Sequence, residues 1–245
     1  MDQFFAEDEN FADGFVHIED AEYNHLKNVL RKKCGDEIRV CRRSGGAYIC
    51  RIEEIDEECI RAAILDMEDD YAELSSKIVL FQGLPKGDKM EMIIQKAVEL
   101  GASEIVPVAM KNCVVKLDEK RAAKKVNRWN GIAEAAAKQS KRSILPNVHE
   151  IISFSEALKY AADLDRIFIP YEHARGMQET KEKMESLKKG DSIGIFIGPE
   201  GGYDPKEIQE AEKYGDIISL GGRILRTETA GLTALSILMY HIELL

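Results

Sequence analysis

The sequence predicts an α/β protein built on a parallel sheet and preceded by a small β-rich domain. From Lys77 onward, short apolar runs alternate with amphipathic stretches, as in parallel strands joined by helices. The first seventy residues instead hold short alternating runs separated by turn residues, which is typical of a small barrel. Two glycine-rich turns near the C-terminus each follow an apolar run, so we expect a ligand at the carboxyl ends of those strands.

The β-rich part is expected to contain one helix and four strands. The helix runs from Ala21 to about Lys32, because its apolar residues recur on one face. The following stretch Met67–Ser75 is acidic and lacks periodicity, so we expect a linker there. We therefore divide the chain into domains of residues 1–72 and 73–245. The four expected strands are Gly14–Ile18, Glu37–Cys41, Ala47–Ile52 and Cys59–Leu65.

The second part is expected to alternate strands with helices up to its last helix. Asp204 and Glu207 form a capping-box pattern around Pro205, which predicts a helix start at that proline. The last helix, about Glu228–Leu244, is apolar almost all round, so we expect it in the core or at a subunit interface. The expected strands are Ile78–Phe81, Glu104–Val108, Arg166–Pro170, Ile193–Ile197 and Ile217–Leu220, and the other helices are Asp88–Leu100, Glu119–Ser140 and Thr180–Lys188.

Charge is distributed unevenly along the chain. The net charge is −10, and residues 1–70 hold 9 basic and 19 acidic side chains, whereas the rest holds 25 of each. Two segments are nevertheless basic: Lys27–Arg43 has seven basic and two acidic residues, and Lys111–Arg142 has ten and three. Taken alone, each run suits a solvated surface of mixed charge as well as a phosphate-binding surface.

Several functional classes lack their sequence signatures. The five cysteines show no C-x-x-C spacing, so we expect no metal site and no disulfide framework, and a reducing cytoplasm is the expected location. No signal-peptide pattern or membrane-length apolar run is present. The G-x-G-x-x-G fingerprint, the P-loop and the G-x-S-x-G and H-E-x-x-H hydrolase motifs are also missing.

Three phrases together carry a family resemblance. They are GDKMEMIIQKAVELGASEIVPV at Gly87–Val108, IGPEGG at Ile197–Gly202 and LGGRILRTETA at Leu220–Ala230. In these the chain resembles the SPOUT methyltransferases and, among them, the RsmE family, which methylates N3 of a uridine in 16S ribosomal RNA. The resemblance implies a PUA-like barrel before a SPOUT domain with a C-terminal trefoil knot. It also implies S-adenosyl-L-methionine as cofactor, the small ribosomal subunit as partner, and a homodimer.

The resemblance also assigns a cofactor site to the two glycine turns. Ile197 and Ile224 are expected as its apolar walls, and Gly201 is expected to leave room that any side chain would take from the ligand. The transferred cofactor-binding residues are Gly198, Glu200, Gly201, Leu220, Gly221, Arg223 and Leu225.

Methylation at N3 requires the uracil to lose a proton, so the enzyme needs a base or a field that favours the anion. We assign the second role to Arg226, whose guanidinium can meet a uracil carbonyl. Glu200 and Glu228 are the candidate bases. Each also has a structural interpretation: Glu200 can cap the turn, and Glu228 can complement the helix N-terminus.

RNA contacts are expected in both parts of the chain. The family's H-x-x-x-V-L-R pattern appears at His25–Arg31, with Gln3 where relatives carry arginine. The A-x-E-Q-S-G-R pattern of many relatives appears with Lys138 and Lys141 as its departures. The candidate RNA-binding residues are His25, Arg31, Lys32, Lys33, Lys111, Gln139 and Arg142.

Two other functions remain open from the sequence. A non-catalytic RNA-binding protein would keep the basic segments and lose the glycine turns, but both turns are intact here. The nearer alternative is a related SPOUT enzyme that methylates another nucleotide position or the ribose 2′-oxygen. The GRILRTETA phrase and the N-terminal barrel favour uridine N3.

Overall fold

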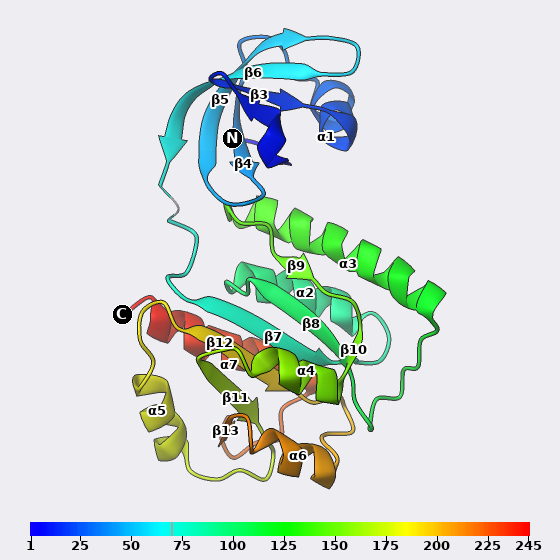
Figure 1. The fold of residues 1–245 in the computed structure, drawn as a ribbon, viewed down its shortest axis with the longest axis vertical. Coiled ribbons are helices and arrows are strands. Elements are labelled where there is room, and N and C mark those ends of the chain that lie inside the picture. The colour runs from blue at the N-terminus through cyan, green and yellow to red at the C-terminus, as the bar shows by residue number, and fades with distance from the viewer. Residues whose placement is uncertain (70) are drawn as a thin grey trace. The chain divides into compact units, whose positions relative to one another are not determined.

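The computed structural model describes residues 1–69 and 71–245, which fall into two compact units (Figure 1). The first unit comprises Met1–Glu73 and Ala137–Leu145, and the second comprises Leu74–Ala136 and Pro146–Leu245. The expected linker Met67–Ser75 includes residue 70, which lies outside the described residues. Strand β6 ends at Glu68 and β7 begins at Lys77.

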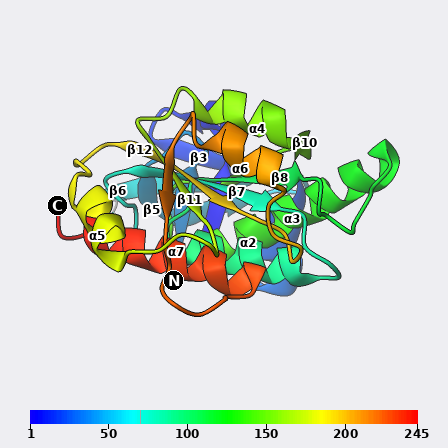
Figure 2. The ribbon, with the colours of Figure 1, turned by 90° about the horizontal axis from the view of Figure 1, so that it is seen from below.

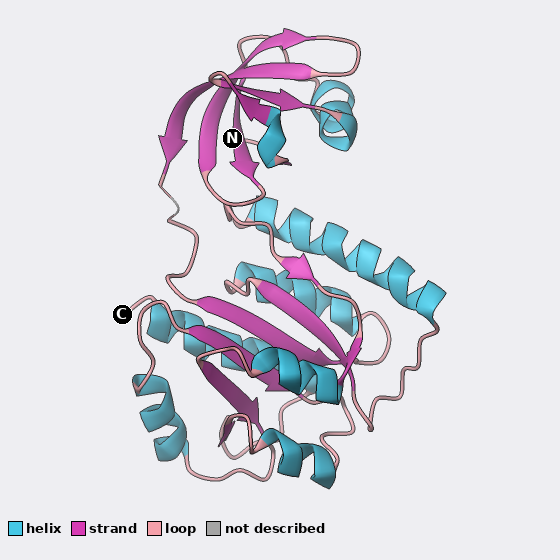
Figure 3. Cartoon of the chain, in the orientation of Figure 1, coloured by secondary structure: helices cyan, strands magenta, loops and turns pink. Residues whose placement is uncertain are grey.

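The first unit is a six-stranded sheet in the order β1-β4-β5-β6-β3-β2. Figure 3 shows that this sheet is curled. The β1–β4 pair is parallel, and the other pairs are antiparallel. Buried apolar side chains such as Phe4, Leu26 and Ile52 fill the concave side. The strands are β1 (Gln3–Ala6), β2 (Phe11–Ala12), β3 (Phe15–Ile18), β4 (Glu37–Arg42), β5 (Ala47–Ile55) and β6 (Ile60–Glu68).

The sequence missed β1 and overextended the helix of this unit. All four residues of β1 are buried, so the strand lacks the alternation that marks a half-exposed strand. The helix consists of α1 (Asp20–Asn24) and a π-helical turn, η2 (His25–Val29), after a short 3₁₀ turn, η1 (Asp8–Asn10), upstream. It ends before Lys32 because Arg31 takes a left-handed backbone conformation, with φ of 55°.

The second unit is a seven-stranded sheet in which every pair is parallel. Its order is β10-β8-β7-β12-β11-β13, and β9 pairs with β8. The sequence therefore predicted the fold class correctly, although it missed the two-residue strands β9 and β10. The strands are β7 (Lys77–Gly83), β8 (Glu104–Ala109), β9 (Asn147–Val148), β10 (Ile152–Ser153), β11 (Arg166–Pro170), β12 (Ser192–Ile197) and β13 (Asp216–Ile218).

Helices cover both faces of this sheet. Figure 2 shows α4 and α6 on one face and α2 and α7 on the other. The Asp204 capping box predicted for α6 is confirmed, since Lys206 N donates to Asp204 and Asp204 N donates to Glu207. A second capping box, at Ser153, starts α4, which the sequence missed. The helices are α2 (Lys89–Glu99), α3 (Glu119–Gln139), α4 (Phe154–Ala161), α5 (Met177–Glu185), α6 (Pro205–Ala211) and α7 (Thr227–Ile242).

The last helix, α7, is buried on one side only. Ala234, Leu235 and Leu238 are fully buried, whereas Tyr240 is 68% exposed and Ile237 is half-buried. We expected this helix either in the core or at a subunit interface, and the first of these two expectations is therefore wrong. The trefoil knot stays a prediction. Across the described residues, no helix is long and apolar enough to cross a bilayer.

Candidate active site

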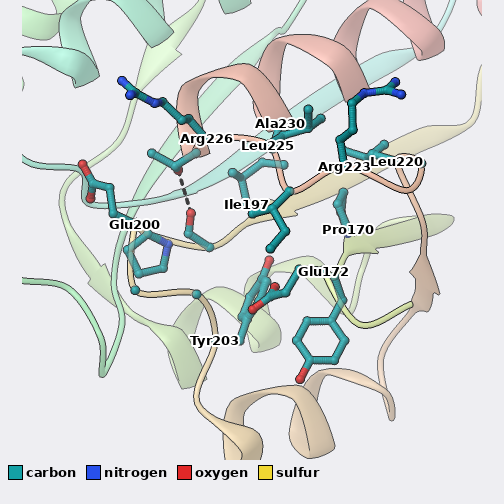
Figure 4. A pocket seen from close by; sticks show the side chains of 18 of the residues that line it. Pro170, Glu172, Ile197, Glu200, Tyr203, Leu220, Arg223, Leu225, Arg226 and Ala230 are labelled. Carbon is teal, nitrogen blue, oxygen red and sulfur yellow. Dashed lines mark hydrogen bonds between the residues drawn. The ribbon is translucent and has the colours of Figure 1, made fainter. Parts of the chain in front are cut away.

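A pocket of about 550 Å³ lies at the carboxyl ends of β11, β12 and β13, which are neighbours in the sheet. Residues of three chain segments at these strand ends form its wall: Pro170–Glu172, Ile197–Tyr203, and Leu220–Thr227 apart from Gly222. Lys89 at the start of α2 and Ala230 in α7 complete it (Figure 4). The carboxyl end of a parallel sheet is where ligands of open α/β folds bind.

The nine residues proposed from the sequence as cofactor-binding all line this pocket. Arg226 lines it too, so the two glycine turns do enclose one space, as expected. Glu228 lies one residue beyond the lining residue Thr227 and contacts Lys89 instead. The nine residues are Ile197, Gly198, Glu200, Gly201, Leu220, Gly221, Arg223, Ile224 and Leu225.

The first glycine turn, Gly198–Gly202, is packed tightly against other parts of the protein. A Cβ atom on Gly198 would lie 3.1 Å from the Tyr203 ring, and one on Gly201 would lie 3.0 Å from both Cβ and O of Asn112. Gly201 also lines the pocket, and a side chain there would meet Asn112 of the β8–α3 loop. These glycines allow protein segments to approach each other closely.

The second glycine turn, Gly221–Gly222, is open. A Cβ atom on either glycine would meet nothing within 4 Å, and Gly221 has a φ of 109°, which favours glycine. Ser219 at its base accepts a hydrogen bond from the Gly221 amide, at 3.3 Å. Beyond it, Ile224 is 86% exposed although it lines the pocket. An apolar side chain left this exposed is available to a ligand or a partner.

A buried hydrogen-bond chain connects the first turn to the start of α7. Thr227 Oγ1 donates to the carbonyl of Gly198 at 2.6 Å and accepts from Gln82 Nε2 at 2.9 Å. Gln82 is fully buried in β7. The chain fixes three separate segments relative to one another, because a buried donor left without its acceptor is costly.

Lys89 forms ion pairs with both candidate bases. Its Nζ lies 3.1 Å from Glu200 Oε1 and 3.2 Å from Glu228 Oε2. Hydrogen bonds to Glu200 and Glu228 raise the pKa of Lys89. Burial raises the pKa of each carboxyl, but hydrogen bonds outweigh burial, so the pKa of Glu200 and that of Glu228 are both lowered. The donors to Glu200 are the Lys86 amide and Lys89. The donors to Glu228 are its own amide and Lys89. Both carboxylates are thus ionised and share one cation.

Comparison with known proteins shows the family. Residues 72–239 match the RNA methyltransferase domain family, and residues 18–65 match the RNA methyltransferase PUA domain family. Ribosomal RNA small subunit methyltransferase E of Bacillus subtilis is 40% identical over 228 residues, which cover 91% of this chain and 89% of the relative. The chain belongs to the RsmE family. The enzyme of the same name from Mesomycoplasma hyopneumoniae is 33% identical over 96% of this chain and 98% of its own length.

A solved structure of an RsmE protein has the same fold. The enzyme from Neisseria gonorrhoeae, solved with S-adenosyl methionine bound, superposes with a TM-score of 0.82 at 32% identity. The match covers 98% of this chain and 97% of the other. It extends over both units, so the PUA-like barrel and the parallel sheet expected from the RsmE resemblance are both confirmed.

The RNA-binding residues proposed from the RsmE resemblance have different surroundings. Arg31, Lys33 and Gln139 are exposed, and His25 is half-buried against the Phe4 ring. Lys32 pairs with Asp2 at 2.8 Å, and Lys111 pairs with Asp204 at 2.5 Å.

Arg142 does not suit a phosphate contact. It is 2% exposed, and its guanidinium pairs with Glu73, with Nη2 2.7 Å from Oε2. Its backbone carbonyl also accepts a hydrogen bond from the buried Gln3 side chain at 2.6 Å. The structure therefore contradicts the RNA-binding role proposed for Arg142, because its charge already has a buried partner.

Sequence reasoning missed several pocket residues. Lys89 lies inside the quoted GDKMEM phrase, so its position next to a shared motif was a usable signal. Glu172 and Tyr171 follow β11, and Tyr203 follows the first glycine turn. Tyr171 and Glu172 could have been found because they come directly after a predicted parallel strand, where ligands of such sheets bind.

Proposed function

We propose that this chain uses S-adenosyl-L-methionine to methylate N3 of a uridine in 16S ribosomal RNA. The observation that carries the proposal is the pocket itself, in which all nine residues expected from the family motifs converge at three strand ends. A relative that matches over nearly the full chain binds this cofactor, which supports the same ligand here.

The pocket fits the cofactor in its size and lining. Its volume of about 550 Å³ lies in the range of small-molecule sites. Ile197 and Leu225 supply apolar surface for an adenine ring, and the open backbone at Gly221 allows close approach of a ligand. Arg223 supplies positive charge on the second turn, which suits a carboxylate end.

When bound, S-adenosyl-L-methionine supplies a methyl group on a positively charged sulfur. The residues of the chain must favour loss of the uracil N3 proton, and Arg226 carries this role in our proposal. Arg226 is exposed, lies at the pocket and occupies the N-cap position of α7. The partial positive charge of the helix N-terminus adds to its own charge, so both stabilise a uracil anion.

Glu200 and Glu228 act as positioning groups in this proposal. Each is ionised and paired with Lys89, so accepting a proton would break an ion pair. Glu200 also accepts a hydrogen bond from the Lys86 amide at 3.0 Å. Together they connect the first glycine turn and the start of α7 to α2, and the site works by electrostatic stabilisation rather than by a carboxylate base.

The two domains divide the work. Residues 1–72 bind RNA, and residues 73–245 bind the cofactor and methylate. In the first domain His25, Arg31 and Lys33 face the RNA. In the second domain Lys111, Lys116 before α3, and Lys120 and Lys124 in the first turns of α3 provide charge, since all four are exposed. Gln139, also exposed, is the remaining RNA contact.

The protein acts as a homodimer in the cytoplasm, where its ribosomal RNA substrate is found. The outer side of α7 supports the dimer, because Ile237 and Tyr240 leave apolar surface uncovered within one chain. Light scattering at micromolar concentration should give twice the chain mass. A monomer mass would refute this part of the proposal.

The reaction is tested with the purified protein. Small subunits from a strain lacking the gene are incubated with methyl-labelled S-adenosyl-L-methionine, and their ribosomal RNA is digested to nucleosides for mass spectrometry. We expect label in 3-methyluridine. Label in a 2′-O-methylated nucleoside would instead establish the related ribose methyltransferase.

A further inference from the structure

Glu172 is a carboxylate in the pocket without a partner. It follows β11 directly, lines the pocket and is exposed. Among the described residues, its carboxylate forms no ion pair and no hydrogen bond. This contrasts with Glu200, the other carboxylate in the pocket lining, which is held by Lys86 and Lys89.

The Glu172 carboxylate lies next to the first glycine turn. A Cβ atom on Gly202 would lie 2.8 Å from Glu172 Oε1, so the carboxylate rests against the first glycine turn. The missing side chain at Gly202 leaves room for the carboxylate there. A charged group packed against a loop of a ligand pocket and left without a partner there is a candidate ligand contact.

Tyr203 provides a second unpartnered group at the same place. The residue is 7% exposed, and within the described chain its hydroxyl is buried without a hydrogen-bond partner. Burial raises the pKa of Tyr203 well above its usual value, and the charge of Glu172 adds to the effect, so the hydroxyl keeps its proton. Figure 4 shows the Glu172 carboxylate beside the Tyr203 side chain. A buried hydroxyl without a partner is costly, which indicates that something binds there.

We propose that Glu172 accepts hydrogen bonds from the ribose hydroxyls of the bound cofactor and that the Tyr203 hydroxyl is the neighbouring donor. A vicinal diol presents two O–H donors, and an ionised carboxylate presents two acceptor oxygens. Each hydroxyl oxygen can also accept one hydrogen bond, which matches the phenol. The inference rests on S-adenosyl-L-methionine as the cofactor.

The arrangement of charges favours the ribose over the methionine end. Arg223 and Arg226 belong to the second turn, and in Figure 4 both point away from Glu172. Arg223 is the cation that suits the methionine carboxylate, and the amino group is attached to the same carbon as that carboxylate. Glu172 therefore meets a different portion of the ligand, and the ribose is the portion with two donors.

Calorimetry with two ligands tests the assignment. S-adenosylhomocysteine carries both ribose and amino acid, 5′-methylthioadenosine carries only the ribose, and neither has the sulfonium charge. We expect Glu172→Ala to weaken both ligands by a similar factor of about 10 to 100, as for hydrogen bonds to a charged group. Tyr203→Phe should weaken both by about tenfold or less. Glu212→Ala, which removes an exposed carboxylate after α6, is the matched control and should change neither.

A ligand change on the unaltered protein makes the test independent of folding. The wild type should bind the 2′,3′-dideoxy form of 5′-methylthioadenosine about 10 to 100 times more weakly than it binds the parent compound. For this dideoxy ligand, Glu172→Ala should bind no more weakly than the wild type does. Weakening of S-adenosylhomocysteine alone in Glu172→Ala would overturn the inference in favour of the amino group. Equal affinity of both ligands for the variant and the wild type would also overturn it. If the wild type bound neither ligand, the cofactor assignment itself would fail.

Discussion

The two glycine turns of the pocket look alike in sequence and differ in their surroundings. In the first turn, a Cβ atom on Gly198 or Gly201 would press against Tyr203 or Asn112, at 3.1 and 3.0 Å. In the second turn, a side chain on Gly221 or Gly222 would meet nothing within 4 Å. The first turn is thus a closed element held by its neighbours, and the second is an open element at the pocket.

This difference shows that one residue type serves two physical purposes. Glycine in the first turn permits contact between segments, since Asn112 also donates a hydrogen bond to the Gly201 carbonyl at 3.2 Å. Gly221 in the second turn permits a backbone angle that other residues avoid. A substitution in the first turn should therefore reduce stability and cofactor binding together, whereas Gly222 should tolerate a side chain.

The largest expected effect comes from a matched pair of valine substitutions. Gly201→Val forces the new side chain against Asn112 and should lower the free energy of unfolding by about 2 to 3 kcal/mol, as overpacking does. It should also weaken S-adenosylhomocysteine by more than about tenfold, because displaced binding groups lose their geometry. Urea denaturation and calorimetry measure the two effects.

Gly222→Val is the control for this pair. Its side chain enters open space, so the free energy of unfolding should stay within about 0.5 kcal/mol of the wild type, as for other surface substitutions. Equal destabilisation by the two substitutions would remove the distinction between a closed and an open turn.

The second prediction concerns Lys89, which holds the closed turn to α7. Lys89→Met leaves Glu200 and Glu228 without their shared cation, and the methyl-transfer rate should fall by about tenfold or more as the turn loses its position. The pKa values of both carboxyls should rise toward their ordinary range, so the acidic limb of the pH–rate profile should move to higher pH. A stopped assay across pH measures both changes.

Lys86→Met is the matched control for this change. Lys86 is exposed, and it holds Glu200 through its backbone amide, which the substitution keeps. Lys89→Arg should restore most of the rate because it restores the charge. If Lys89→Met kept the wild-type rate and pH profile, the ion pairs would have no role in positioning the turn.

The third prediction compares the pocket with the opposite end of the sheet. There, at the start of β8, Glu104 contacts His149 at 2.7 Å and also pairs with Lys77 and Tyr160. The hydrogen bond from His149 is the main cause that lowers the pKa of Glu104 to about 2, and Lys77 and Tyr160 add to it. A lowered carboxyl pKa contributes stability above the unfolded pKa, and this contribution is lost as pH falls from about 4.5 to about 2.

Glu104→Gln should therefore cost about 1 kcal/mol at pH 7, after allowance for solvent screening. The cost should shrink toward zero near pH 2.5, and affinity for S-adenosylhomocysteine should not change. Urea denaturation at the two pH values measures the difference. A cost that is equal at both pH values would mean that packing, and not charge, explains it.

The sequence predicted the parallel sheet and the glycine turns that line one pocket because these features depend on local patterns. Buried parallel strands give continuous apolar runs, and Asp204, Pro205 and Glu207 encode a helix start within four residues. The contacts of Lys89 could not be predicted, since its two partners lie 111 and 139 positions away in the chain.

The same limit explains the errors in the first unit. Arg142 looks like a surface cation in sequence, but its partner Glu73 is 69 residues away. The segment Ala137–Leu145 belongs to the first unit although it begins within the end of α3, and no local pattern marks that change. Burial depends on long-range contacts, so residue type alone does not distinguish a phosphate contact from a buried ion pair.

The smallest expected effect concerns RNA binding by the barrel. Arg31 and Lys33 are exposed, whereas Lys32 is half-buried and pairs with Asp2. Removing one side chain that binds a phosphate should reduce the salt dependence of RNA binding by about one charge, so Arg31→Ala with Lys33→Ala should reduce it by about two. Filter binding across a salt series measures the slope, and Lys32→Ala alone should change it by less. An unchanged slope in the double variant would exclude these two side chains as RNA contacts.

The central claim is tested most directly by nucleoside analysis of 16S ribosomal RNA from a strain that lacks the gene for this chain. Mass spectrometry should show that 3-methyluridine is absent from the deletion strain and returns when the wild-type gene is supplied on a plasmid, but not when Gly201→Val is supplied. Persistence of 3-methyluridine in the deletion strain, or loss of a different methylated nucleoside, would contradict the proposed function.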